Sequence, residues 1–177
     1  GDVYKRQSLG YAFDNGFSIA GGFSSPETEI AGDESDLFGL NAAYTADSYG
    51  VAVAYVTDDG GSKTLTRTGA ETTTWGVQGY YTFDLASLSA GYETQETGGT
   101  DSTGYFVGLS FPEVGPGSVN VAAATTGLFK DSESEKLVYE ASYSYPVNDA
   151  MTITPGVFIY EDTTDDTGVA VKASFAF

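Results

Sequence analysis

Residues 166–177 read DTGVAVKASFAF, and this closing stretch alternates between two kinds of side chain. One parity is apolar and the other is small or polar. The apolar parity carries Thr167, Val169, Val171, Ala173, Phe175 and Phe177, and the other carries Gly168, Ala170, Lys172, Ser174 and Ala176. Because successive side chains of a β-strand point to opposite faces, the stretch predicts an amphipathic strand.

The same alternation recurs about eleven times along the chain. The predicted strands are 8–13, 17–24, 37–45, 49–57, 72–83, 86–95, 104–111, 118–128, 137–145, 151–160 and 167–177. Short turns (14–16, 46–49, 84–86, 112–117, 146–149) alternate with connections that are mostly longer and more acidic (25–36, 58–71, 96–102, 129–136, 161–166). A meander with tight turns at one end and longer loops at the other is typical of transmembrane β-barrels.

Composition excludes several classes of function. The 177 residues hold 7 Lys+Arg against 25 Asp+Glu, a net charge of -18, with no His and no Cys. Nucleic acid is excluded as a partner because phosphates are bound by Lys and Arg. Without His and Cys there is no disulfide, no thiolate or imidazole metal site and no Ser-His pair. Carboxylate chemistry stays open, either as paired acids or as calcium or magnesium binding. Because the acidic connections lack the spacing of a calcium-loop motif, we predict no metal and no cofactor. No apolar run is long enough for a transmembrane helix.

Aromatic residues on the apolar parity cluster toward the strand ends, and the strand middles are aliphatic. Two such girdles around an aliphatic band match the two interfaces of a bilayer. The predicted girdle includes Trp75, Tyr81, Phe83, Phe111, Tyr145 and Phe175. The sequence therefore predicts an all-β fold, an antiparallel up-and-down transmembrane β-barrel. Because eleven is an odd number, we expect these strands to be part of a larger barrel.

The opposite parity is small and polar, which predicts a wide, water-filled lumen, since Gly and Ala cannot fill a barrel interior. The candidate pore-lining residues are Asn41, Gln78, Glu93, Asn120, Glu140 and Lys172. The charged ones either tune selectivity or are solvated wall residues without a special role. Glu93 and Glu140 are the only hint of a paired-acid glycosidase, but they fall three strands apart, so no enzyme is predicted.

The C-terminal Phe177, which closes an amphipathic strand, resembles the assembly signal of outer-membrane proteins. Residues 143–157, YSYPVNDAMTITPGV, and the closing strand resemble the last hairpins of cyanobacterial outer-membrane porins. Those proteins carry an S-layer-homology domain and a barrel related to carbohydrate-selective porins, and some are called iron uptake porins. The resemblance implies passive diffusion of ions and small solutes (sugars or inorganic iron among them). It also implies outer-membrane lipid and the barrel assembly machinery as partners, and usually a homotrimer.

Acidic residues crowd the longer connections. They are Glu27, Glu29, Asp33, Glu34 and Asp36 in one, and Glu161, Asp162, Asp165 and Asp166 in another. An acidic pore mouth would favour the entry of cations. The alternatives are solvated loops that keep the protein soluble, or carboxylates that bind a divalent ion.

Two features need separate treatment. Residues 2–7, DVYKRQ, look like a translated sequencing adapter, so residues 1–7 are set aside as non-native and 8–177 are taken as the C-terminal part of a porin-type barrel. Pro155 interrupts a predicted strand, and we expect a bulge to absorb its missing donor.

The alternatives to a porin are a secreted acidic β-sandwich that acts as an adhesin or carbohydrate-binding module, and an outer-membrane barrel enzyme.

Overall fold

The computed structural model describes residues 3–27, 36–59, 70–130, 135–161 and 166–176. Regular structure in these residues is β-strand throughout, and they include no helix long and apolar enough to cross a membrane. The strands are β1 (Val3–Ala12), β2 (Phe17–Glu27), β3 (Leu37–Thr45), β4 (Tyr49–Asp58), β5 (Thr72–Thr82), β6 (Ser87–Thr97), β7 (Thr100–Val114), β8 (Gly117–Thr125), β9 (Phe129–Lys130), β10 (Leu137–Asn148), β11 (Met151–Tyr160) and β12 (Asp166–Phe175).

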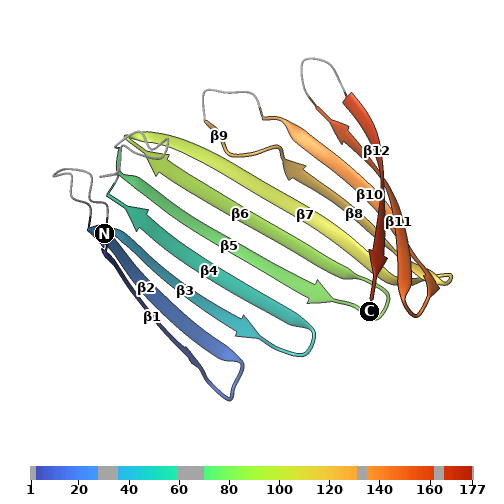
Figure 1. Cartoon of the computed structure of the whole chain (residues 1–177), viewed down its shortest axis with the longest axis horizontal. Coiled ribbons are helices and arrows are strands. Elements are labelled where there is room, and N and C mark those ends of the chain that lie inside the picture. The colour runs from blue at the N-terminus through green and yellow to red at the C-terminus, as the bar shows by residue number, and fades with distance from the viewer. Residues whose placement is uncertain (1–2, 28–35, 60–69, 131–134, 162–165, 177) are drawn as a thin grey trace. The chain divides into compact units, whose positions relative to one another are not determined.

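The strands form an antiparallel up-and-down sheet in chain order, and Figure 1 follows this succession from β1 to β12 by colour. Only β9 leaves the path, and it pairs with β7. The contacts divide the chain into two compact units, residues 1–78 with 92–103 and residues 79–91 with 104–177. The all-β up-and-down architecture predicted from the alternation is confirmed.

In the first unit, β1 to β4 pair in unbroken register. The β1–β2 ladder runs to Ala12 opposite Ser18, and the β3–β4 ladder runs from Leu37 opposite Asp58. Gly16 has a φ of 85° in the tight turn between β1 and β2, a conformation that favours glycine. The Asn15 side-chain oxygen accepts a hydrogen bond from the Phe17 amide at 3.2 Å.

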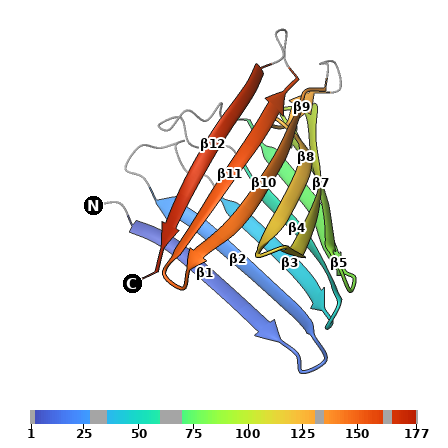
Figure 2. The same ribbon diagram turned by 90° about the vertical axis from the view of Figure 1, so that its right-hand side faces the viewer.

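In the second unit, β7, β8, β10, β11 and β12 are successive partners, and Figure 2 shows β10, β11 and β12 side by side. The β11–β12 register runs unbroken from Met151 opposite Phe175 to Tyr160 opposite Asp166. It passes through Pro155 without a shift, so the bulge expected there is not found. The shift in β10–β11 lies between Pro146 and Asn148 instead. Pro155 is therefore accommodated with the register of β11 and β12 kept.

The structure corrects two predicted connections. Residues 96–102, predicted to be a longer loop, form a hairpin turn at Gly98 and Gly99, whose φ values are 57° and 79°. Two consecutive positive φ angles match the twist of the flanking strands, so a two-residue turn suffices. The predicted loop 129–136 contains the short strand β9, which adds a twelfth strand, and the predicted strand 118–128 ends at Thr125.

Strand β1 extends farther toward the N-terminus than predicted. It begins at Val3, which lies opposite Glu27 of β2. The pairing therefore includes residues 3–7, which were predicted to be non-native. Backbone hydrogen bonds make this pairing, so it says nothing of the origin of those residues. Their assignment to an adapter stays a prediction.

The described part of the sheet has no hydrophobic core. Among the described residues no apolar side chain is buried, and large apolar side chains such as Leu9 and Val169 are more than four fifths exposed. A water-soluble domain of this length buries most of its apolar surface. The exposed apolar side chains therefore require an apolar environment that this chain does not itself provide.

Candidate pore wall

The pairing register sorts the side chains of the sheet into two faces, because residues directly opposite each other on antiparallel strands share a face. In the second unit an apolar row crosses five strands, and the row beside it is small and polar. The apolar row is Leu109, Val121, Ala141, Val157 and Val169, and the polar row is Ser110, Asn120, Ser142, Gly156 and Ala170. We call these two sides the apolar face and the polar face.

The first unit shows the same division. Its apolar row is Tyr11, Ile19, Ala42 and Val53, and the adjacent polar-face row is Gly10, Ala20, Asn41 and Ala54. Tyr11 is 63% exposed and Val53 49%. In both units these apolar rows lie on one face and the small, polar rows on the other, the division expected of a wall between lipid and water.

Aromatic rings on the apolar face pair near the strand ends. At the tight-turn end, Tyr81 and Phe83 have ring centroids 4.7 Å apart, and Tyr143 and Tyr145 are 6.5 Å apart. In the first unit, toward the longer connections, Trp75 lies 5.6 Å from Tyr92. The predicted girdle residues Trp75, Tyr81, Phe83, Tyr145 and Phe175 are all exposed, and Phe111 is half-buried. Phe177, the predicted assembly signal, lies outside the described residues.

The uncharged pore-lining candidates lie on the polar face. Asn41 in β3 is opposite Ala20 and Ala54, and Asn120 in β8 is opposite Ser110 and Ser142. Gln78 lies on β5 at the same parity as Thr74, whose hydroxyl accepts a 3.1 Å hydrogen bond from the Gln95 amide of β6. Small neighbours leave these amides room to reach solvent.

The charged candidates lie on the same face but at different heights. Glu140 is opposite Phe158, whereas Lys172 is opposite Thr154, four residues away along β11. At about 3.3 Å per residue they are some 13 Å apart along the strand direction, too far for an ion pair. In the first unit Glu93 lies beside Gly76. Within the second unit, Glu140 and Lys172 thus share the polar face without forming a pair.

Hydroxyl groups pair across strands on the polar face, a feature that the sequence did not single out. Thr82 and Ser87 are joined by a 2.9 Å hydrogen bond, and Ser144 and Thr154 by one of 3.1 Å. In the first unit, Thr72 and Thr97 are 3.2 Å apart. These pairs hold the strands together while leaving hydroxyl oxygens for water.

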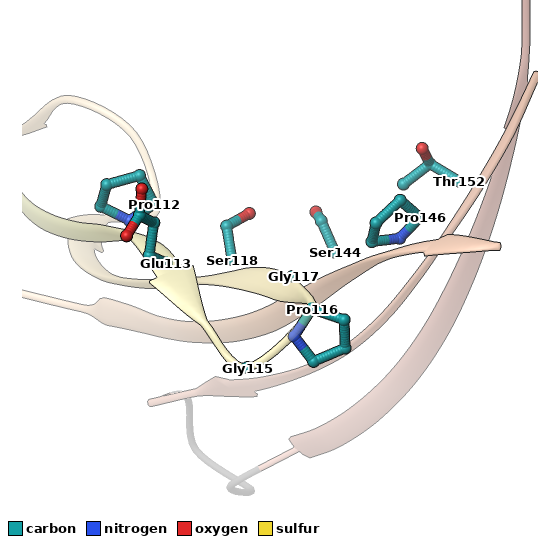
Figure 3. A pocket seen from close by; sticks show the side chains of 9 residues that line it. All are labelled: Pro112, Glu113, Gly115, Pro116, Gly117, Ser118, Ser144, Pro146 and Thr152. Atoms are coloured by element: carbon teal, nitrogen blue, oxygen red, sulfur yellow. The ribbon is translucent and has the colours of Figure 1, made fainter. Parts of the chain in front are cut away.

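A shallow pocket of about 370 Å³ lies on the polar face at the tight-turn end of the second unit. It is lined by Pro112, Glu113, Gly115, Pro116, Gly117, Ser118, Ser144, Pro146 and Thr152. Figure 3 shows the Ser118 and Ser144 hydroxyl groups pointing to the same side of the sheet. The pocket is open and offers a single carboxylate, Glu113, so it does not form a catalytic pair.

The predicted acidic mouth is described only in part. Glu29, Asp33, Glu34, Asp162 and Asp165 lie outside the described residues. Glu27 ends β2 and Asp166 begins β12. Asp36 donates its backbone amide to Asp59 at 2.9 Å, and Glu161 accepts a 3.0 Å hydrogen bond from the Tyr139 hydroxyl. The described part of the chain contains no group of three or more metal-ligating side chains.

A sequence model of the Gram-negative porin family matches residues 7–175, nearly the whole chain. The chain belongs to the Gram-negative porin family. Its place is therefore the outer membrane. No curated protein sequence matches this porin-family chain.

Solved porins share its fold. A refined porin structure is 17% identical, with a TM-score of 0.74 over 96% of this chain and 60% of that one. OmpT of Vibrio cholerae is 11% identical, with a TM-score of 0.67 over 96% of this chain and 64% of that one. A mutant Rh. blastica porin is 14% identical, with a TM-score of 0.59 over 99% of this chain and 80% of that one. The chain thus spans less than two thirds of the first two.

Proposed function

We propose that this chain supplies wall strands of a water-filled outer-membrane channel through which ions and small hydrophilic solutes diffuse passively. The observation that carries the proposal is the division of the sheet into an exposed apolar face and a small, polar opposite face. Lipid covers the first, and water fills the space beside the second. Membership of the porin family supports a channel rather than an enzyme.

The β-sandwich alternative does not fit the described residues. A sandwich packs two sheets face to face and buries apolar side chains between them. Here no described apolar side chain is buried, and the strands follow chain order instead of Greek-key crossings. An adhesin or carbohydrate-binding module of that kind is therefore not supported.

We further propose a modest preference for cations. The net charge is -18, and the described connections at the longer-loop end carry Asp36, Glu135 and Glu161. Carboxylates around a pore mouth raise the local concentration of cations. The polar face itself carries few charges, so the preference would arise mainly at the mouth.

Two finer attributes of the channel rest on the resemblance to cyanobacterial outer-membrane porins: passage of sugars or inorganic iron, and a homotrimer. Recognition by the barrel assembly machinery rests on the likeness of Phe177 to the assembly signal of outer-membrane proteins. A role in selectivity for Lys172, Glu140 and Glu93 rests on their charge and on their place on the polar face. Each stays a proposal. The small side chains of the polar face are compatible with any small hydrophilic solute.

The test is conductance in a planar bilayer, with the full-length protein that contains this chain purified in detergent. We expect stable ohmic steps and a cation-selective reversal potential across a salt gradient. Replacing Asp36→Asn together with Glu161→Gln should lower the selectivity. Asp84→Asn together with Asp149→Asn is the matched control, because it removes the same charge from the tight turns.

Two results would count against the proposal in different ways. Steps without selectivity would keep the channel and reduce the loop carboxylates to solvated charges. Protein that stays folded without detergent and repeatedly fails to conduct would remove the channel itself.

A further inference from the structure

An aromatic pair interrupts the small, polar character of the polar face. Phe158 and Tyr160 in β11 are two residues apart and point to the same side, with ring centroids 5.5 Å apart in an edge-to-face arrangement at 75°. Tyr160 is 40% exposed and Phe158 is half-buried. Two accessible rings on a face that borders water call for an explanation other than lipid contact.

The backbone of β12 makes room for this pair. Phe158 is directly opposite Gly168, and its ring lies over the glycine so closely that a Cβ on Gly168 would overlap it. The ring is thus turned across the neighbouring strand. On the other side Phe158 is directly opposite Glu140, and Ala122 lies one strand beyond Glu140. Small residues, Gly168 and Ala122, thus flank the pair formed by Phe158 and Glu140.

A carboxylate flanks the rings on each side. Glu140 in β10 is directly opposite Phe158, and Asp166 in β12 is directly opposite Tyr160. Both acids are exposed. Lys172 lies four residues beyond Gly168, about 13 Å along β12. The charged side chains next to the two rings are therefore the carboxylates of Glu140 and Asp166, and the ammonium group of Lys172 belongs to a more distant part of the strand.

Aromatic faces attract cations through the ring quadrupole, and desolvated organic ammonium ions gain most from them. A sodium ion is held in its hydration shell and gains less. We propose that Phe158, Tyr160, Glu140 and Asp166 form a binding subsite for organic ammonium ions, with quaternary ammonium groups as the preferred class. The proposal deepens the proposed channel, because it takes the polar face as its water-filled wall.

The test is equilibrium dialysis of radiolabelled tetramethylammonium against the full-length protein that contains this chain, folded in detergent micelles. We expect saturable binding that an equal concentration of sodium does not displace. Phe158→Leu and Tyr160→Leu should each weaken binding about two- to fivefold, because each removes one ring. Glu140→Gln should weaken it as well, whereas Tyr160→Phe should bind as the parent protein does.

Phe106→Leu is the matched control. Phe106 is also an aromatic residue of the polar face that lies over a glycine, Gly91, but Ala124 is opposite it in place of an acid. We expect unchanged binding in this variant. Folding of every variant is checked by the heat-dependent shift in gel mobility that folded barrels show.

Two outcomes would overturn the subsite: tetramethylammonium displaced equally well by sodium, or Phe158→Leu and Glu140→Gln both binding as the parent does. Conductance of the same preparation separates this inference from the proposed function. Selective binding without conductance would keep the subsite and remove the channel, whereas conductance without selective binding would remove the subsite alone.

Discussion

Val171 faces away from the polar side of β12 and is 71% exposed, so a charge at this position would enter lipid. An arginine on the lipid face costs about 2–4 kcal/mol at the bilayer midplane. We expect Val171→Arg to lower the folded fraction in lipid vesicles, measured by the heat-dependent gel shift. Ala170→Arg, one residue away on the polar face, should fold normally. Normal insertion of Val171→Arg would show that the two faces are assigned wrongly.

Gly117, the first residue of β8, allows the backbone of β10 to come close. A Cβ at this position would overlap the Ser144 carbonyl oxygen, which cannot move without the strand. We expect Gly117→Ala to destabilise the fold by about 1–3 kcal/mol, the usual cost of overpacking. The midpoint of urea unfolding in vesicles measures the effect. Gly127→Ala is the control, because nothing lies within 4 Å of that Cβ, and equal midpoints for the two variants would contradict the close approach.

At the scale of elements, the turn between β6 and β7 depends on two positive φ angles. Gly98 has the left-handed conformation that asparagine tolerates and β-branched residues avoid. We expect Gly98→Val to lower stability by about 1–2 kcal/mol and Gly98→Asn to change it little. Urea unfolding of both variants compares them directly. If valine and asparagine behave alike, residues 96–102 form a loop and not a tight hairpin.

The strands were predictable where one parity is consistently apolar, as in β12, because one face meets lipid and the other water. Alternation gave no such signal at Phe158, Ile159 and Tyr160, where both parities are apolar. The register was needed to place Phe158 opposite Glu140 and Gly168. Strand β9 is two residues long, too short for any periodic pattern, and the Gly98–Gly99 turn was hidden among polar residues typical of loops.

At the scale of the whole molecule, the central claim is that one face of the sheet meets lipid and the other meets water. The claim accounts for the lack of buried apolar side chains among the described residues. It also accounts for a likeness to porins at only 11–17% identity, because alternation constrains the class of residue at each position and not its identity.

Cysteine scanning of β12 tests this claim most directly, since the chain has no cysteine of its own. Each residue from Val169 to Ser174 is replaced singly by cysteine, and the protein folded in vesicles is treated with a charged, water-soluble thiol reagent. Reaction in denaturant shows that every thiol is competent. We predict fast reaction at positions 170, 172 and 174 and slow reaction at 169, 171 and 173. Equal rates at all six positions, or the opposite alternation, would contradict the account.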